Sequence, residues 1–344
     1  MTAMKAIGYK QPGAIGRTDS LMDIVVPEPI ATGRDLLVEI RAVSVNPADT
    51  KVRADIVNNP NGGEDYKILG YDASGVVRAV GDDVTLFNVG DKVYYAGSIA
   101  RAGTNSELHL VDERIVGHMP TSLDFAQAAA LPLTAITAWE MLFDRFGIAP
   151  GKQPTDKSLL IIGAAGGVGS IMTQLARRLT PLTVIGTASR AETQAWVKEL
   201  GAHHVINHSR PIAEELQRLG IPIVDYIVSL AQTTAHMDQV AIAIAPQGKF
   251  GLVDDPAVVD IAPFKTKSVS VHWEMMFTRS LFTTSDMVGQ HYLLNEVAQL
   301  VDAGLIRTTL AERFGTINAA NLKRAHALIE TGKARGKIVL EGWD

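Results

Sequence analysis

A glycine-rich turn is the segment of this chain with the clearest chemical meaning. Ala164-Ala165-Gly166-Gly167-Val168-Gly169 follows an apolar run at 159–162 and precedes a helical pattern at 171–179. Between a strand and a helix, such a turn lets backbone N–H groups approach a pyrophosphate, because Gly166 has no Cβ and Gly169 allows tight packing. We therefore predict a dinucleotide site whose contacts are Ala165, Gly166, Gly167 and Val168. The alternative is an ordinary tight turn in a doubly wound sheet.

The next strand ends without the acidic residue that would bind the ribose 2′-hydroxyl of NAD. No Asp or Glu occurs between positions 169 and 192, and Ser189 and Arg190 follow the strand instead. A hydroxyl and a guanidinium suit a 2′-phosphate, so this pattern predicts NADP(H). Alternatively, Ser189 caps the next helix and Arg190 is solvated. His208, after the third strand, either flanks the adenosine or belongs to a surface loop.

Composition excludes several classes of function. Cysteine is absent from the 344 residues, which removes thiolate ligands, thiol nucleophiles and disulfides. The net charge of −5 gives no electrostatic basis for binding nucleic acid or an anionic membrane. No apolar run reaches the ~18 residues of a membrane span, and the N-terminus lacks the apolar region of an export signal. We therefore expect a cytoplasmic protein.

Periodicity divides the chain into a β-rich part and an alternating part. Residues 4–120 contain short alternating β segments, which are typical of a mostly antiparallel β unit. From Phe125 strands and helices alternate, which predicts a parallel sheet with helices on both faces. A Rossmann unit is thus inserted between two parts of another domain, and the last strand is expected to rejoin the first part. Further expected elements are a helix capped by Asp124 at 126–130, helices at 135–146, 286–303 and 318–331, and a strand at 337–340.

Several motifs in a fixed order resemble the medium-chain dehydrogenase/reductase superfamily over nearly the whole chain. They lie at 45–51, 69–77, 80–84, 89–93 and in the glycine turn. Within that superfamily the chain is most similar to the quinone oxidoreductase branch. Closer still is the zinc-type alcohol dehydrogenase-like subgroup, which residues 272–280 and 293–296 resemble.

The resemblance implies an α/β fold with two domains. A mostly β GroES-like catalytic domain is expected at 1–125 and 276–344. A Rossmann NADP-binding domain, with a doubly wound parallel sheet, is expected at 126–275. The resemblance also implies a homodimer, because an edge strand comparable to 268–273 pairs across a two-fold axis in the superfamily.

The chain departs from the zinc enzymes of the superfamily at the metal position. Asn46 stands where those enzymes have a cysteine, and Gly70-Tyr71-Asp72 replaces their Gly-His-Glu. A catalytic zinc ion needs three protein ligands from Cys, His or Asp/Glu. We therefore expect no metal, and Asp72 either lines the pocket or pairs with a nearby cation. The neighbouring His203 and His204 are more typical of a solvated edge than of a metal site.

The resemblance assigns four candidate catalytic residues. Asn46 and Asp49 match residues at the nicotinamide end of the quinone oxidoreductase branch. Lys51 stands where related enoyl reductases have a Tyr, and either delivers a proton or is solvated. Tyr71 lines the pocket at the former zinc position.

Further residues are assigned by resemblance to cofactor contacts. Thr137 matches a threonine near the nicotinamide, although a helix-surface hydroxyl is the alternative. Leu252, Val253 and His272 lie where the branch contacts the carboxamide, and Lys337 is expected to reach the 2′-phosphate. The side chains of Trp273, Met275, Met276 and Phe277 either wall an apolar acceptor site or belong to core or interface.

Without a metal, a conjugated acceptor is the substrate class most suited to reduction. Hydride adds to an electron-poor atom of a quinone or enone, and the charge spreads onto oxygen. The resemblance thus implies a zinc-independent, NADPH-dependent reductase of quinones or α,β-unsaturated carbonyls. The alternatives are a carbonyl reductase or alcohol dehydrogenase of the same superfamily, and a nucleotide-binding protein with little turnover.

Overall fold

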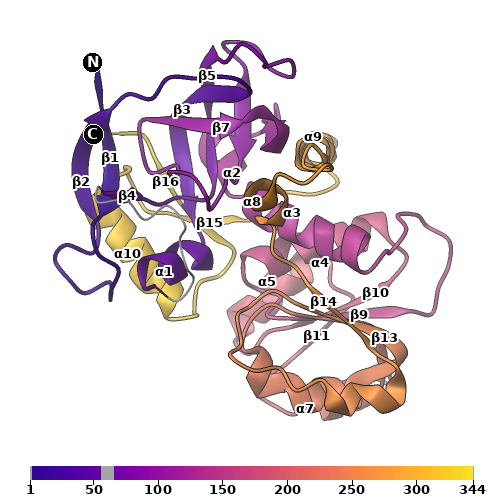
Figure 1. The fold of residues 1–344 in the computed structure, drawn as a ribbon. Coiled ribbons are helices and arrows are strands. Elements are labelled where there is room, and N and C mark those ends of the chain that lie inside the picture. The colour runs from indigo at the N-terminus through magenta and orange to yellow at the C-terminus, as the bar shows by residue number, and fades with distance from the viewer. Residues whose placement is uncertain (1, 56–65, 344) are drawn as a thin grey trace. The chain divides into compact units, whose positions relative to one another are not determined.

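The chain folds into two compact units (Figure 1). The computed structural model describes residues 2–55 and 66–343. Unit 1 comprises Met1–Ile136 and Phe277–Asp344, and unit 2 comprises Thr137–Met276. Unit 2 is therefore inserted into unit 1, in agreement with the predicted fold class. The sequence placed the two divisions after residues 125 and 275, whereas in the structure they follow Ile136 and Met276.

Unit 1 is built on two β-sheets. The smaller sheet has the order β2–β1–β4, and the larger has seven strands in the order β15–β16–β3–β5–β6–β8 with β7 paired to β3. β16 runs antiparallel to β3, with Ile338 opposite Val45. The C-terminal strand thus rejoins the N-terminal part of the chain, as predicted. The strands are β1 (Ala3–Tyr9), β2 (Met22–Pro27), β3 (Asp35–Val45), β4 (Lys67–Ile68), β5 (Ala73–Val80), β6 (Lys92–Tyr95), β7 (Leu108–Asp112), β8 (Val116–His118), β15 (Leu310–Arg313) and β16 (Lys337–Glu341).

Short helices of unit 1 cover these sheets. The predicted cap is confirmed, because the Asp124 carboxylate accepts a hydrogen bond of 2.7 Å from the Gln127 N–H at the start of α2. α9 packs against β8, and α10 packs against α1. The helices are α1 (Pro47–Arg53), the 3₁₀ turn Glu113–Ile115, α2 (Phe125–Ala129), α8 (Thr278–Phe282), α9 (Gly289–Asp302) and α10 (Ala319–Glu330).

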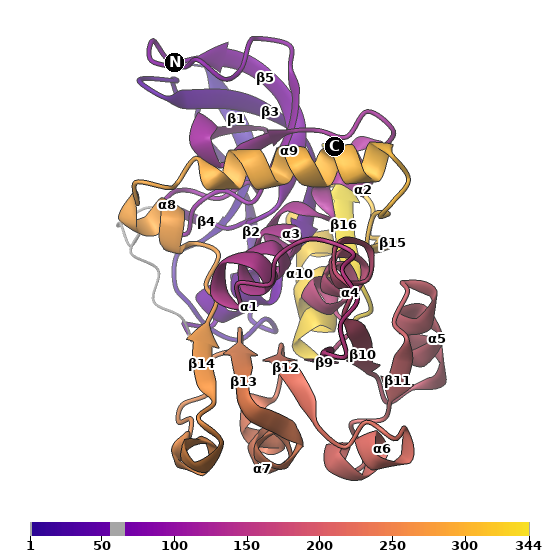
Figure 2. The ribbon, with the colours of Figure 1, turned by 90° about the vertical axis from the view of Figure 1, so that its right-hand side faces the viewer.

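Unit 2 contains a six-stranded parallel sheet in the order β11–β10–β9–β12–β13–β14. Figure 1 shows α4 and α5 on one side of this sheet and α7 on the other, and in Figure 2 the arrowheads of β12, β13 and β14 point the same way. The strands are β9 (Ser158–Ile162), β10 (Thr183–Thr187), β11 (His204–Ile206), β12 (Val224–Ser229), β13 (Ile244–Leu252) and β14 (Ser270–Trp273). The helices are α4 (Gly167–Leu179), α5 (Ala191–Glu199), α6 (Ile212–Arg218), α7 (Thr233–Ala243) and the 3₁₀ segment Ala262–Lys267.

The core of unit 2 explains why its strands are continuous apolar runs. Both faces of a parallel sheet are covered by helices, so neither face needs polar side chains. β9 is buried at every residue. The core includes Leu160, Ile162, Ile185, Val224, Ile227 and Phe250.

One predicted helix has different bounds and a different character. The sequence predicts a helix at 135–146, whereas α3 (Pro132–Trp139) begins at Pro132 and continues as a π-helix, Glu140–Arg145. Proline is favourable in the first turn, where its missing N–H has no intrahelical partner. The next N–H, of Leu133, donates to the Asp72 carboxylate at 2.8 Å, a partner that local sequence does not reveal. Within the described residues, no helix combines the length and the apolar character that a membrane crossing requires.

Candidate active site

The predicted glycine turn forms a cradle at the start of α4. Gly166 is the N-cap residue of this 13-residue helix, and a Cβ at Gly166 would meet only the Gly163 carbonyl oxygen, at 3.6 Å. At Gly169, by contrast, a Cβ would lie 2.5 Å from Ala164 Cα, so only glycine permits this approach. The first turn of α4 therefore offers backbone N–H groups to open space, which fits a pyrophosphate. The four predicted contact residues, Ala165, Gly166, Gly167 and Val168, all lie on this turn.

The end of β10 gathers the predicted adenosine-side residues. The Gly163 N–H donates to Thr187 Oγ1 at 3.1 Å, and Thr187 Oγ1 lies 2.8 Å from His208 Nδ1. His208 is thereby held at the same strand end from which Ser189 and Arg190 follow. Arg190, rather than Ser189, is the N-cap residue of α5, so the alternative role of Ser189 as the cap is wrong.

The side chains of Ser189 and Arg190 are available to a ligand to different extents. Ser189 is exposed. The Arg190 side chain is 40% exposed and its guanidinium lies 3.5 Å from the Glu192 carboxylate. An exposed ion pair of this length contributes little stability, so a bound phosphate can compete for the guanidinium.

The residues predicted at the nicotinamide end lie along the carboxyl edge of the same sheet. Leu252 is the last residue of β13, and His272 of β14 pairs with Gly251 of β13. The Val253 N–H donates to the Ser229 carbonyl at 3.2 Å. Dinucleotides bind outside the carboxyl ends of strands in open α/β sheets, so this placement fits the prediction. Thr137, the first residue of unit 2, lies buried on α3.

The apolar residues near the end of β14 differ in exposure. Trp273 and Met275 are 54% and 44% exposed, whereas Met276 and Phe277 are buried. Within unit 1, Phe277 packs edge-on against Tyr71, with ring centroids 5.1 Å apart. This arrangement favours the core and interface interpretation of these four residues over a single apolar wall.

A buried polar network occupies the former zinc position in unit 1. Lys337 Nζ donates to Asp72 Oδ2 at 2.9 Å and to the Val45 carbonyl at 3.2 Å, and it also contacts Asn46 Oδ1. Asn46 Nδ2 donates to the same Asp72 oxygen at 2.8 Å. All three polar side chains of this network, Asn46, Asp72 and Lys337, are buried.

This donor set does not fit a zinc ion. Both oxygens of Asp72 are engaged, one by the Lys337 ammonium and the Asn46 amide and the other by the Leu133 N–H. Zinc ligands are thiolates, imidazoles or carboxylates, whereas the remaining groups here are an amide and a phenol. Across the part of the chain that the structure describes, no cluster of three His, Asp or Glu side chains is arranged to hold a metal.

The predicted role of Lys337 at the 2′-phosphate is therefore wrong. Its ammonium is buried among Asp72, Asn46 and a backbone carbonyl of unit 1. Removing it from these partners would leave the Asp72 carboxylate unpaired in the interior, which is costly. The alternative that Asp72 pairs with a nearby cation is confirmed.

The structure also gives Asn46 and Asp49 structural roles, and their catalytic roles stay predictions. Asp49 Oδ2 accepts from the Asn46 N–H at 2.7 Å, and Asp49 Oδ1 accepts from the Gly70 N–H at 3.0 Å. Burial raises the pKa of Asp49 to about 7, against the opposing effect of these N–H groups. The Asn46 amide is engaged within the network. The two side chains thus hold the start of α1 against the residues before β5.

Tyr71 and Lys51 remain as candidate proton donors. Tyr71 is buried, and burial followed by the Asp49 charge raises the pKa of its phenol, so it stays neutral and able to donate. Lys51 is half-buried in the last turn of α1. The structure does not decide whether Lys51 is catalytic or solvated, so its role stays a prediction.

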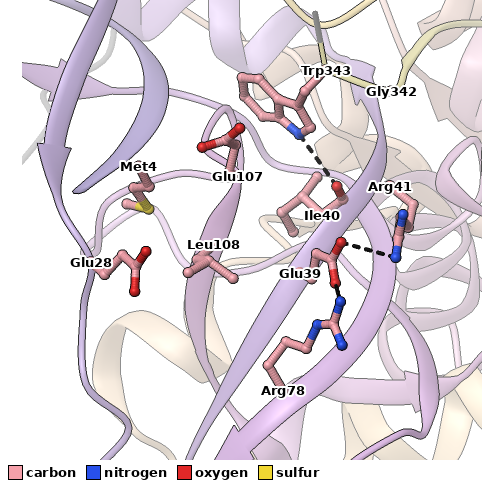
Figure 3. Close-up of a pocket in the computed structure, with 10 residues that line it drawn as sticks. All are labelled: Met4, Glu28, Glu39, Ile40, Arg41, Arg78, Glu107, Leu108, Gly342 and Trp343. Carbon is pink, nitrogen blue, oxygen red and sulfur yellow. Dashed lines mark hydrogen bonds and ion pairs between the residues drawn. The ribbon is translucent and has the colours of Figure 1, made fainter. Parts of the chain in front are cut away.

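A polar pocket of about 430 Å³ lies elsewhere in unit 1 and contains no predicted site residue. Figure 3 shows Glu39 between two guanidinium groups, and its carboxylate pairs with Arg41 at 2.9 Å and also with Arg78. Trp343 Nε1 donates to the Ile40 carbonyl at 3.3 Å. Because no predicted site residue lines it, the pocket does not match either half of the predicted site.

Replacement of Lys337 tests the buried network. Lys337→Met leaves Asp72 without its cation, so we expect the free energy of unfolding to fall by about 3–5 kcal/mol in urea titrations. The double variant Asp72→Asn/Lys337→Met removes both charges and should recover part of this loss. Lys152→Met, at an exposed loop position, is the matched control. A loss below about 1 kcal/mol for Lys337→Met would show that the network does not stabilise unit 1.

Comparison with known proteins agrees with this architecture. Residues 32–130 match the alcohol dehydrogenase GroES-like domain family, and residues 200–340 match the zinc-binding dehydrogenase family. A zinc-type alcohol dehydrogenase-like protein of Staphylococcus aureus is 38% identical over 340 residues, covering 98% of this chain and 99% of that protein. The β-rich part of unit 1 is thus GroES-like, as the resemblance implied.

Solved structures show the same fold over the whole chain. A Rhizobium etli protein described as a candidate zinc-dependent alcohol dehydrogenase is 56% identical with a TM-score of 0.96, covering 100% of this chain and 99% of the other. A quinone oxidoreductase from Coxiella burnetii is 27% identical with a TM-score of 0.81, covering 99% and 100%. The protein is therefore an oxidoreductase that belongs to the medium-chain dehydrogenase/reductase superfamily.

Proposed function

We propose that the protein is a zinc-independent, NADPH-dependent reductase of quinones or α,β-unsaturated carbonyls. The observation that carries this proposal is the buried network of Asn46, Asp72 and Lys337, in which an ammonium engages the carboxylate at the metal position of zinc relatives. An acceptor that is activated by its own conjugation needs no Lewis acid. The Coxiella quinone oxidoreductase, which shares the fold at 27% identity, supports this substrate class.

NADP(H) is the proposed cofactor, and it would supply a hydride when bound. The glycine turn of unit 2 would hold the pyrophosphate, and Ser189, Arg190 and His208 would face the adenosine ribose and its phosphate. Thr137, Leu252, Val253 and His272 would contact the nicotinamide end. The exposed hydroxyl of Ser189 and the guanidinium of Arg190, in place of an acidic residue, support NADP(H) over NAD(H).

The protein groups of unit 1 would act on the acceptor rather than on the hydride. Tyr71 would donate a hydrogen bond to the acceptor oxygen, because its phenol stays neutral. Lys51 would stabilise the developing enolate or deliver a proton. These groups would orient the acceptor and stabilise charge on its oxygen.

Quaternary structure and compartment are part of the proposal. β14 is an edge strand of its sheet. The exposed side chain of Trp273 ends this strand, and the exposed side chain of Met275 follows two residues later. An exposed apolar edge is a site for strand pairing with another copy, which supports a homodimer formed through β14. The proposed compartment is the cytoplasm.

Two other functions have some support. The description of the Rhizobium etli structure, at 56% identity, favours a carbonyl reductase or alcohol dehydrogenase. The structural roles of Asn46 and Asp49 favour a nucleotide-binding protein with little turnover. Substrate comparison separates these possibilities from the reductase.

Initial rates with a quinone, an enone, an aldehyde and a primary alcohol test the proposed reaction. We expect NADPH oxidation with the quinone and the enone, because their conjugation activates them, and far slower NADPH oxidation with the aldehyde or NADP⁺ reduction with the alcohol. Faster turnover of the aldehyde or alcohol would favour the alternative enzyme. NADPH binding without turnover of any acceptor would favour the nucleotide-binding alternative.

Arg190→Ala tests the cofactor preference. Loss of a charge-assisted contact to the 2′-phosphate costs about 1.5–3 kcal/mol, so the Kd for NADPH should rise about 10–100-fold while that for NADH stays the same. The exposed Arg178, changed to Ala, is the matched control. An equal effect on both nucleotides, or none on either, would contradict a phosphate contact by Arg190.

A further inference from the structure

Two buried carboxyl groups in unit 2 share one guanidinium. Glu140, the first residue of the π-helix, is fully buried, and Glu274, which follows β14, is 2% exposed. Arg145 Nε donates to Glu274 Oε2 at 2.7 Å, and its Nη2 lies 3.8 Å from Glu140 Oε2. If both carboxyls were ionised, one negative charge would stay uncompensated in the interior, which is costly.

A shared proton resolves this imbalance. Burial, followed by the charge of Glu140, raises the pKa of Glu274 to about 9 from its ordinary 4.5. At neutral pH the cluster therefore holds one carboxylate, one carboxylic acid and one guanidinium, and its net charge is zero. Like-charge carboxyl pairs in other buried sites share a proton for the same reason.

Two further titratable groups near the cluster, Lys249 and His272, lie on β13 and β14. Burial, Lys249 and Arg145 lower the pKa of His272, so its ring is neutral at neutral pH. Lys249 Nζ donates to the Phe146 carbonyl. Apart from burial, Glu140 and Arg145 are the groups that most affect the pKa of Glu274.

The cluster is attached to the strand ends that carry the predicted nicotinamide contacts. The Glu274 N–H donates to the Leu252 carbonyl at 3.1 Å. Gly251 has no room for a side chain, because a Cβ there would collide with the sulfur of Met141 in the π-helix. A shift of the π-helix or of Glu274 would therefore move Leu252 and its neighbours.

We propose that Glu140, Arg145 and Glu274 are positioning residues that hold the carboxyl ends of β13 and β14 for the nicotinamide end of the cofactor, and that loss of their shared proton releases this hold. The inference rests on the proposed NADP(H) function. It adds a proton-dependent clamp that acts through Leu252 and its neighbours and has no contact with the reacting atoms.

The sign of the pH dependence follows from the raised pKa. Between about pH 4.5 and 9 the folded protein keeps a proton that the unfolded chain releases, so stability falls as pH rises through this window. Above about pH 9 the folded protein also loses the proton, and the clamp opens. Cofactor affinity should therefore decline only at the alkaline end.

The test compares NADPH with adenosine 2′,5′-bisphosphate, which lacks the nicotinamide, by calorimetric titration from pH 7 to 10. If the nicotinamide end binds well only when the cluster is protonated, the Kd for NADPH rises about tenfold by pH 10. The Kd for the bisphosphate should not show this rise. Glu274→Gln mimics the carboxylic acid, so it should bind NADPH like the wild type at pH 7 and keep that affinity at pH 10. Glu214→Gln, at an exposed position, should retain the wild-type profile.

Three outcomes would overturn the clamp. They are a flat NADPH profile in the wild type, an unchanged alkaline decline in Glu274→Gln, and an equal decline for both ligands. Glu140→Gln removes the same surplus charge and provides a second variant if Glu274→Gln does not fold. Absence of NADPH binding by the wild type at pH 7 would instead overturn the proposed function on which the clamp rests.

Discussion

The contact between the Lys337 ammonium and the Asp72 carboxylate is the constraint on which unit 1 depends. The two groups lie 2.9 Å apart in the interior, where neither charge is tolerated alone. Their pairing joins the start of β16 to the residue before β5, and the same ammonium donates to the Val45 carbonyl at the end of β3. Asp72 in turn accepts a hydrogen bond from the Leu133 N–H in the first turn of α3. One buried ion pair thus ties together strands and a helix that are distant in sequence.

This constraint also shapes the chemistry. Both oxygens of the Asp72 carboxylate accept hydrogen bonds, from an ammonium, an amide and a backbone N–H, and the ammonium occupies the place that a divalent ion would need. The scaffold keeps the nucleotide cradle of its superfamily in unit 2, while unit 1 offers a neutral phenol at Tyr71 and an ammonium at Lys51. In the proposed reaction these groups would orient an acceptor and stabilise charge on its oxygen, which would suit a substrate that is already electron-poor.

Local sequence patterns predicted the fold well. They could not predict polar contacts between residues that are distant in sequence. Short stretches of sequence are enough to recognise the glycine turn, the alternation of strands and helices, and the last strand. Lys337 and Asp72 are 265 positions apart, so nothing near either residue indicates the pair. Asn46-Pro47-Ala48-Asp49 did carry a usable signal, because Asn, Pro and Asp in these positions are typical of a helix start. The resemblance assigns catalytic roles to two of the same residues, Asn46 and Asp49, and those roles stay predictions. The carboxyl pair of Glu140 and Glu274 gave no signal, because charged residues are expected at the surface.

The most direct test of the account is the metal content of active enzyme. The protein is dialysed against a strong chelator, and the same sample is divided between elemental analysis and an assay of NADPH-dependent quinone reduction. The account predicts full activity with far less than one zinc ion per chain. One zinc ion per chain before dialysis, with activity that is lost on its removal and restored by zinc, would contradict it.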